Sequence, residues 1–334
     1  MITSREIRLK ARPKGEPRLD DFELACIQVP PPAPGQVQVR NRFMSVDPYM
    51  RGRLSEQASF IAPFRLGAAL EGGAVGEVIA SAAPGFAPGD IVLSMFGWRE
   101  AFTATPDEAA LERIDTSGFD VSAFLGVMGM PGLTAYIGLL RIAGLKADET
   151  VFVTAAAGAV GHIVCQIARA HGARVIGSAG GPRKAHFLRG LGVNHVIDYH
   201  ATADLAQALN HYAPDGIDVC FDNVGGTHLE AALLAARPFA RIALCGAIAM
   251  YRKPAQPSGL TLSQIIRKNL RLEGFQTPAR ASLAPLFLDD MRGWVASGQV
   301  SGHETVLEGI EQAPNAFLRL FDGGNIGKML VRLA

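Results

Sequence analysis

A short glycine-bearing turn between a predicted strand and a predicted helix places the strongest constraint on this chain. Residues 151–155 form an apolar run that predicts a buried strand, and residues 161–170 predict a helix. The Ala-Ala-Gly-Ala-Val segment between them and the first residue of the helix, Gly161, together match the dinucleotide-binding pattern Gly-x-Gly-x-x-Gly, with alanine at its first position. The N-terminus of such a helix presents free backbone N–H groups to a pyrophosphate. We therefore expect a dinucleotide to contact Ala157, Gly158, Ala159, Val160 and Gly161.

The residues after this turn alternate between predicted strands and predicted helices. Six strands separated by helical segments indicate an α/β fold with a doubly wound parallel sheet and helices on both faces. A dinucleotide is then expected outside the carboxyl ends of the strands, where the strand order reverses. The predicted strands are residues 151–155, 174–178, 195–198, 217–222, 241–245 and 270–275.

The segments on either side of this alternating region carry shorter strand patterns. Residues 1 to about 125 contain apolar-alternating runs split by proline and glycine, which predict a compact β-barrel-like domain. The last strand pattern, residues 325–332, is expected to return to that domain. At 334 residues the chain is also longer than one hydrophobic core usually organises, so two domains are expected.

Composition and charge exclude several classes of partner. The formal net charge is +1 and no basic cluster is interleaved with aromatic residues, so we expect no nucleic-acid binding. No apolar run is long enough to span a bilayer, and the charged N-terminus lacks the apolar core of a signal peptide. We therefore expect no membrane association and a cytoplasmic location. The four cysteines have no zinc spacing, and we assign no metal site.

The tip of the second predicted strand indicates which nicotinamide dinucleotide binds. NAD-binding chains place an acidic residue about twenty residues after the glycines, where it accepts a hydrogen bond from the ribose 2′-hydroxyl. Here residues 178–184 are Ser-Ala-Gly-Gly-Pro-Arg-Lys, in which Gly180 gives space and Arg183 and Lys184 give positive charge. This combination favours the 2′-phosphate of NADP(H). A second interpretation, that the two basic residues only solvate a helix start, stays open.

Several longer motifs, in order along essentially the whole chain, carry a resemblance to a known family. They are Ser-Val-Asp-Pro-Tyr-Met-Arg-Gly at 45–52, Gly-Val-Met-Gly-Met-Pro-Gly-Leu-Thr-Ala-Tyr at 126–136, the Ala-Ala-x-Gly-Ala-Val-Gly turn, Phe-Asp-Asn-Val-Gly-Gly at 221–226 and Asn-Ile-Gly-Lys at 325–328. On these motifs the sequence resembles the medium-chain dehydrogenase/reductase superfamily. Within it, the sequence is most similar to the zinc-independent alkene reductases of the prostaglandin reductase, leukotriene B4 12-hydroxydehydrogenase and curcumin reductase group.

The resemblance implies a domain arrangement and an oligomeric state. It implies a GroES-like β-barrel catalytic domain that is interrupted by a Rossmann domain, in a homodimer. We accordingly predict that residues 1–128 form the first part of the catalytic domain, that residues 129–300 form the NADP-binding domain, and that residues 301–334 return to the catalytic domain.

The resemblance also implies an activity. Zinc-dependent members have a cysteine in the segment that matches residues 45–47, and Gly-His-Glu where this chain has Ala69-Leu70-Glu71, so both zinc ligands are missing here. Without a Lewis acid to polarise an alcohol or carbonyl oxygen, alcohol oxidation loses its usual electrophile. The implied reaction is NADPH-dependent hydride transfer to the β-carbon of an α,β-unsaturated ketone or aldehyde.

Two tyrosines are the catalytic candidates by resemblance. Tyr251 matches the polar group beside the nicotinamide ribose, which hydrogen-bonds the ribose and the substrate oxygen or relays a proton. Tyr49 and Met50 match residues that line the substrate pocket. Ordinary packing stays open for both tyrosines, in a loop for Tyr251 and in the core for Tyr49.

The remaining candidates match contacts to the cofactor. Met130 and Thr134 match contacts to the nicotinamide carboxamide, although the Thr134 hydroxyl is equally compatible with a bond to its own helix backbone. Lys184 and Tyr199 match residues at the 2′-phosphate, and Asn223 matches a ribose or pyrophosphate contact. Structural roles stay open for the last three candidates, which are Cys245 and Phe275 beside the nicotinamide and Asn325 from the C-terminal segment.

One histidine and two alternative functions complete the sequence-based expectations. His162 lies in the glycine turn, where we expect a helix-surface histidine, with proton transfer as the open alternative. Zinc-free relatives also reduce quinones by the same hydride delivery, so a quinone reductase stays open. A binding protein that keeps NADPH affinity but does little catalysis is the alternative of a different class. Tyr49, Tyr251 and Asn325 argue against it, since a pure binder needs no substrate-side tyrosines.

Overall fold

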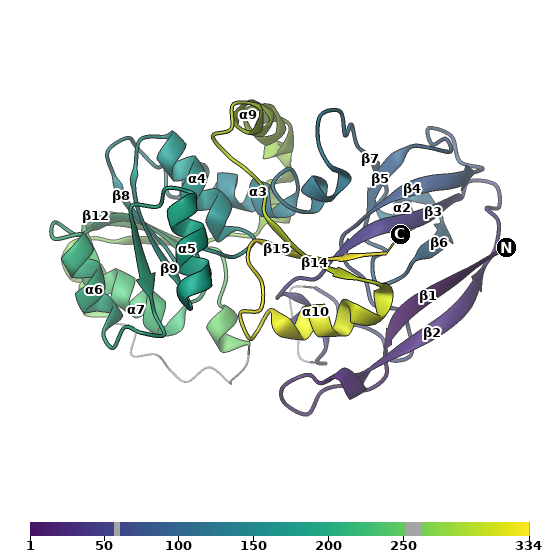
Figure 1. The fold of residues 1–334 in the computed structure, drawn as a ribbon, viewed down its shortest axis with the longest axis horizontal. Helices are drawn as coiled ribbons and strands as arrows, with labels where there is room; N and C mark the ends of the chain where they lie inside the picture. The colour runs from purple at the N-terminus through teal and green to yellow at the C-terminus, as the bar shows by residue number, and fades with distance from the viewer. Residues whose placement is uncertain (57–60, 252–261, 334) are drawn as a thin grey trace. The chain divides into compact units, whose positions relative to one another are not determined.

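The computed structural model describes residues 1–56, 61–251 and 262–333, and the chain divides into two units (Figure 1). Unit 1 contains Met1–Leu125, Glu304–Asn325 and Met329–Ala334, and unit 2 contains Gly126–His303 and Ile326–Lys328. The short segment Ile326–Lys328 thus belongs to a different unit from the residues on either side of it. The domain boundaries at residues 128 and 300 stay a prediction.

A six-stranded parallel sheet forms the centre of unit 2. Its strand order is β10-β9-β8-β11-β12-β13, and every paired strand runs parallel to its neighbour. This is the strand order 3-2-1-4-5-6 of a Rossmann fold, which confirms the predicted fold class. The strands are β8 (Thr150–Val153), β9 (Arg174–Ala179), β10 (His195–Asp198), β11 (Ile217–Asp222), β12 (Ala236–Leu244) and β13 (Arg271–Gly274).

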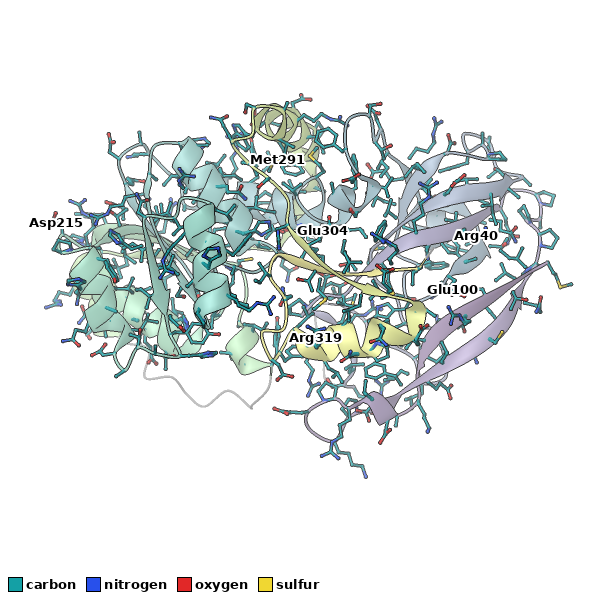
Figure 2. All side chains as sticks on the ribbon, in the orientation of Figure 1. Arg40, Glu100, Asp215, Met291, Glu304 and Arg319 are labelled. Carbon is teal, nitrogen blue, oxygen red and sulfur yellow. The ribbon has the colours of Figure 1, made fainter. Side chains whose placement is uncertain are left out.

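The helices of unit 2 lie in right-handed crossovers between parallel strands, and this handedness decides which face of the sheet each helix covers. Such crossovers place α4 and α5 on one face of the sheet and α6, α7 and α8 on the other (Figure 1). Helix α9, which carries the buried Met291 labelled in Figure 2, packs against α3. The helices are α3 (Met130–Tyr136), a π-helical continuation (Ile137–Ile142), α4 (Gly161–Ala170), α5 (Pro182–Gly190), α6 (Leu205–Tyr212), α7 (Gly226–Ala235), α8 (Leu262–Lys268) and α9 (Ala284–Ala296), with 3-10 turns at Ile248–Met250 and Thr277–Leu283.

Strand order reverses between β8 and β11, and this position fixes where a ligand site can form. From β8 the chain proceeds outward to β9 and β10, and from β11 it proceeds in the other direction to β12 and β13. The loops after β8 and β11 therefore diverge and leave a crevice at the carboxyl ends of the strands. The glycine turn follows β8 directly, so it lies at this switch point.

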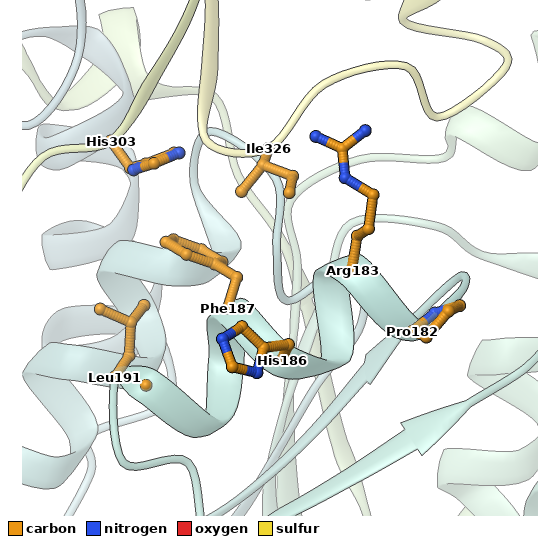
Figure 3. Close-up of a pocket in the computed structure, with 8 residues that line it drawn as sticks. Pro182, Arg183, His186, Phe187, Leu191, His303 and Ile326 are labelled. Atoms are coloured by element: carbon orange, nitrogen blue, oxygen red, sulfur yellow. The ribbon is translucent and has the colours of Figure 1, made fainter.

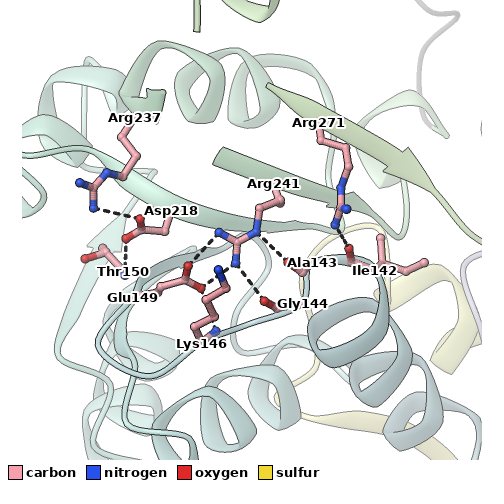
Figure 4. Close-up of polar contacts among 10 residues, drawn as sticks. All are labelled: Ile142, Ala143, Gly144, Lys146, Glu149, Thr150, Asp218, Arg237, Arg241 and Arg271. Atoms are coloured by element: carbon pink, nitrogen blue, oxygen red, sulfur yellow. Dashed lines mark hydrogen bonds and ion pairs between the residues drawn. The ribbon is translucent and has the colours of Figure 1, made fainter. Parts of the chain in front are cut away.

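A polar network closes the opposite end of the same sheet (Figure 4). The Arg241 guanidinium donates to both carboxylate oxygens of Glu149, at 2.8 and 2.7 Å, and to the carbonyls of Ala143 and Gly144. These carbonyls follow the π-helical segment and have no helical donor of their own, so one side chain satisfies the helix end and the carboxylate together. The network holds α3 and its continuation in place against the sheet.

Unit 1 is built mainly from antiparallel strand pairs. A seven-stranded sheet has the order β14-β15-β3-β4-β5-β7, with β6 also paired to β3, and β1 and β2 form a separate hairpin. The C-terminal strand β15 pairs antiparallel with β3, as the predicted return of the chain requires. The strands are β1 (Ile2–Leu9), β2 (Phe22–Val29), β3 (Val37–Ser45), β4 (Ala74–Ser81), β5 (Ile91–Ser94), β6 (Ala101–Ala104), β7 (Glu112–Arg113), β14 (Glu304–Glu308) and β15 (Lys328–Arg332).

An aromatic cluster anchors the core of unit 1. The Trp98 ring is fully buried, stacks on Phe22 with centroids 6.2 Å apart, and meets Phe317 edge-on at 6.2 Å. At the surface, Glu100 (labelled in Figure 2) accepts from the backbone N–H and the guanidinium of Arg5 and so ties β1 to the β6 edge. The helical segments are Leu19–Asp21, α1 (Met50–Arg53), α2 (Pro106–Ala109), Val121–Leu125, Ile310–Gln312 and α10 (Ala313–Arg319).

Helix lengths bear on the expected absence of a membrane span. Within residues 1–56, 61–251 and 262–333, no helix is both long enough and apolar enough to cross a bilayer.

Candidate cofactor and active site

The glycine turn is closed by direct contact between backbone atoms. A Cβ atom added to Gly161 would lie 2.4 Å from the Ala155 carbonyl oxygen, and one added to Gly158 would lie 3.1 Å from the same atom. Ala155 itself adopts a left-handed conformation with φ of 47°, which turns the chain sharply at the end of β8. Any side chain at Gly161 would therefore push the first turn of α4 away from the strand.

A segment from the C-terminal part of the chain is bonded to this turn within unit 2. The Gly327 N–H donates to the Ala157 carbonyl at 2.8 Å, and the Lys328 N–H donates to the His303 carbonyl at 2.8 Å. Gly327 has φ of 68°, and a Cβ there would lie 1.9 Å from the His303 carbonyl oxygen. Only glycine fits at this position. Ile326–Lys328 therefore acts as a short strap that holds the glycine turn.

His162 is buried, so the expectation of a helix-surface histidine is wrong. The residue is 1% exposed, and its Nδ1 lies 2.7 Å from the Gly158 carbonyl oxygen. Burial lowers the pKa of the imidazole to about 4, so the ring is neutral at physiological pH. A neutral ring that bonds a carbonyl through Nδ1 must carry its proton there. His162 thus donates to Gly158 and fixes the peptide orientation in the middle of the turn.

Asp222 organises the other side of the crevice, at the end of β11. Its buried carboxylate accepts from the Thr154 hydroxyl at 2.7 Å and from the backbone N–H groups of Val224 and Gly225. The Asn223 side-chain amide donates to the Thr154 carbonyl at 2.8 Å, and its backbone N–H donates to the Thr154 hydroxyl. The ends of β8 and β11 are therefore locked together, and Asn223 is held at the switch point.

The residues expected at the 2′-phosphate follow the ends of β9 and β10. A Cβ on Gly180 would lie 2.8 Å from the Tyr199 hydroxyl, so the glycine is what allows the phenol to approach. Asp198 accepts from the Gly181 N–H, and this bond is the main cause that lowers the pKa of its carboxyl. Lys184 is half-buried and makes no ion pair or hydrogen bond with any residue in the described part of the chain. Burial lowers the pKa of its ammonium group.

Met130 and Thr134 lie one turn apart on α3. The Thr134 hydroxyl is 2.7 Å from the Met130 carbonyl oxygen, which is the bond to its own helix backbone that the sequence left open. The same hydroxyl is 2.7 Å from the hydroxyl of Thr277, and both threonines are buried. One lone pair of Thr134 remains for a further partner, so the predicted carboxamide contact stays a prediction.

Three further candidates follow the ends of β12 and β13. Cys245 is the first residue after β12, and burial raises the pKa of its thiol to about 12. Burial is also the main cause that raises the pKa of Tyr251, with the Cys245 sulfur as the second. Both groups are protonated at neutral pH and can donate a hydrogen bond. Phe275 follows β13 and meets Phe221 edge-on, with ring centroids 6.3 Å apart.

Three candidates belong to unit 1 and are not brought together with the others by the fold of unit 2. Tyr49 precedes α1, and burial is the main cause that raises the pKa of its phenol, followed by the charge of Asp47. Met50 is fully buried in the core of unit 1, where its side chain occupies the space above Gly72. Asn325 is the last residue of unit 1 before the strap. The predicted roles of these three residues stay predictions.

A shallow pocket of about 660 Å³ lies on unit 2 beside the strap (Figure 3). Phe187 from α5, Leu191 directly after α5 and Ile326 from the strap give it an apolar lining, and Arg183 and His303 add polar groups. The Phe187 and His303 rings lie 4.6 Å apart. Among these residues the sequence had suggested a role only for Arg183, and Ile326 lies in the Asn-Ile-Gly-Lys motif without a role assigned to it.

Comparison with known proteins gives matches over the whole chain. A family model described as the N-terminal domain of oxidoreductase matches residues 5–114, and one described as zinc-binding dehydrogenase matches residues 159–290. The NADP⁺-dependent 2-alkenal reductase of Nicotiana tabacum is 37% identical over 100% of this chain and 98% of its own. Prostaglandin reductase 1 of Rattus norvegicus is 38% identical over 99% of this chain and 100% of its own.

A solved structure of a related protein has the same fold. CurA of Vibrio vulnificus, solved in complex with NADPH, is 37% identical and superposes with a TM-score of 0.93 over 99% of both chains. This chain belongs to the prostaglandin and curcumin reductase group of the medium-chain dehydrogenase/reductase family. Membership agrees with the resemblance inferred from the motifs. It also agrees with the two units of the fold, the Rossmann unit and the mainly antiparallel unit.

One of the matching family models is described as zinc-binding dehydrogenase. Among the residues that the structure describes, no group of three or more histidine, cysteine, aspartate or glutamate side chains is placed to hold a metal ion.

Sequence reasoning missed the residues that hold the site in shape. Thr154 and Asp222 are 68 positions apart, so no local pattern links them. A signal did exist for Asp222, since it lies in the Phe-Asp-Asn-Val-Gly-Gly motif directly before the candidate Asn223. Gly327 also had one, because it is the glycine of Asn-Ile-Gly-Lys. Thr277 and His303 carried no signal.

Gly161→Ala should destabilise the protein, because its new Cβ meets backbone that cannot move aside. We expect the free energy of unfolding to fall by about 1–3 kcal/mol, the cost of forcing extra volume into a closed contact. Gly190→Ala is the matched control, since a Cβ at Gly190 in α5 meets no atom within 4 Å. Urea denaturation of both variants measures the difference. Equal losses would contradict the contact between α4 and the end of β8.

Proposed function

We propose that this protein reduces the activated C=C bond of α,β-unsaturated ketones and aldehydes with NADPH as hydride donor. The observation that carries the proposal is Lys184, a half-buried ammonium at the start of α5 that has no partner among the described residues, in a chain that matches NADP-dependent alkene reductases along its whole length. An unpaired cation that has lost part of its water is costly, and an anionic phosphate compensates that cost.

The residues present fit the dinucleotide. The cradle needs glycine at Gly158 and Gly161, where a Cβ would approach the Ala155 carbonyl oxygen. The α4 N-terminus offers N–H groups for the pyrophosphate, and Gly180, Lys184 and Tyr199 are the proposed contacts of the 2′-phosphate. The proposed contacts along the rest of the dinucleotide are Asn223, Met130, Thr134, Cys245, Phe275 and Asn325.

The reaction needs a hydride and a stabilised oxyanion. When bound, the nicotinamide would supply a hydride to the β-carbon, and negative charge would develop on the carbonyl oxygen before the α-carbon takes a proton. Tyr251 and Tyr49 are the proposed donors to that oxygen, with Met50 proposed beside Tyr49. Burial raises the pKa of both phenols, so each keeps its proton at neutral pH and can donate a hydrogen bond to the developing charge.

We also propose that the enzyme works in the cytoplasm as a homodimer. The expected location rests on the lack of an apolar run in the sequence long enough to span a bilayer, and the dimer rests on the family resemblance. Exposed apolar side chains on unit 2 support a partner surface, since Phe239 is 70% and Ile266 77% exposed.

Lys184→Ala should raise the KM for NADPH by about tenfold to a hundredfold and leave the KM for NADH nearly unchanged. The range corresponds to one charge-assisted hydrogen bond of about 1.5–3 kcal/mol, converted at about 1.4 kcal/mol per tenfold. Lys146→Ala serves as control, because Lys146 is exposed and precedes β8, at the end of the strand away from the glycine turn. Equal increases for both cofactors would exclude the phosphate contact.

The purified protein should oxidise NADPH faster with a medium-chain 2-alkenal or enone than with a quinone. The physical reason is that hydride addition to the β-carbon concentrates negative charge on one carbonyl oxygen, which the two proposed phenol donors would stabilise. NADPH absorbance followed across a panel of enals, enones and quinones makes the measurement. Equal or higher rates with quinones would favour a quinone reductase, and no turnover with any acceptor would favour an NADPH-binding protein.

A further inference from the structure

Two buried hydroxyls and one carbonyl form a short chain in unit 2. The Thr277 hydroxyl lies 2.7 Å from the Thr134 hydroxyl, which lies 2.7 Å from the Met130 carbonyl oxygen. Thr277 is the first residue of the 3-10 turn after β13, and the two threonines are 143 positions apart in the sequence. Each threonine is 8% exposed, so water has little access to either hydroxyl.

The number of protons in this chain determines what it offers to a ligand. A hydroxyl has one proton to donate and two lone pairs to accept with. Thr134 gives its proton to the Met130 carbonyl, so the short contact with Thr277 requires Thr277 to be the donor. Both protons are then used, and the position that stays free on Thr134 is a lone pair. This chain therefore presents acceptors only.

We propose that Thr277 is a positioning residue that fixes Thr134 as an acceptor for the carboxamide N–H₂ of the nicotinamide. The inference rests on the proposed NADPH-dependent function. A carboxamide offers two N–H donors, which match an acceptor-only chain, whereas its carbonyl oxygen does not. Thr277 would thereby select one rotamer of the carboxamide without contacting the cofactor itself.

A merely structural role for Thr277 makes a different prediction. The hydroxyl pair also connects the turn after β13 to α3, and loss of that contact would weaken the binding of all cofactors to the same extent. A cofactor analogue separates the two roles. The 3-acetylpyridine analogue of NADP⁺ has a methyl group where the carboxamide has N–H₂, so it keeps the acceptor and lacks the donors.

The test compares the dissociation constants of NADP⁺ and of its 3-acetylpyridine analogue by isothermal titration calorimetry. The proteins are the full-length wild type, Thr277→Val, which keeps the shape but has no hydroxyl, and Thr277→Ser, which restores it. In Thr277→Val, Thr134 becomes free to rotate and donate, so the preference for NADP⁺ over the analogue should fall by about threefold to tenfold, the effect of one neutral hydrogen bond. Thr277→Ser should keep the wild-type preference.

Three outcomes would overturn the inference. They are an unchanged preference in Thr277→Val, equal weakening of both ligands, and loss of the preference in Thr277→Ser. Thermal unfolding of each apo variant shows whether the fold is intact. Because binding is measured without an alkene, an enzyme that fails to reduce enones still tests Thr277, and the two failures can be told apart.

Discussion

The site depends on one close approach, the contact between the first turn of α4 and the end of β8. Gly161 lies so near the Ala155 carbonyl that no side chain fits between them. Because the helix starts directly against the strand, its free N–H groups face the crevice where β8 and β11 diverge. His162 and the strap at Gly327 then hold the carbonyls of Gly158 and Ala157. The turn is therefore rigid before any ligand arrives, which lowers the entropic cost of binding.

Charge at the site is arranged in a different way from charge elsewhere in unit 2. Arg241 is fully paired, with Glu149 and two carbonyls as partners, and closes one end of the sheet. Lys184, near the other end, is unpaired among the described residues and loses water by burial. A paired cation contributes to the fold, whereas a desolvated and unpaired cation costs stability that only an incoming anion offsets. This contrast is why Lys184 carries the proposed cofactor preference.

Periodicity predicted the Rossmann unit closely, because the central strands β8, β9 and β11 are buried on both faces and appear as apolar runs. The helix over Gly161–Ala170 has the predicted bounds, while β12 begins five residues before the predicted strand at 241. Pro238 and Phe239, whose backbone is left-handed, interrupt the strand pattern, so the sequence does not show that β12 starts there. Contacts between residues distant in sequence, such as Thr154 with Asp222 or Thr134 with Thr277, were beyond local patterns, because only the fold brings them together.

The central claim is that hydride from a 2′-phosphorylated nicotinamide goes to carbon rather than to a carbonyl group. It is tested most directly with NADPH carrying deuterium at the transferred position, an enone substrate, and analysis of the product by NMR and mass spectrometry. The account predicts a saturated ketone with one deuterium on the β-carbon and an intact carbonyl. An allylic alcohol with deuterium on the former carbonyl carbon would contradict it.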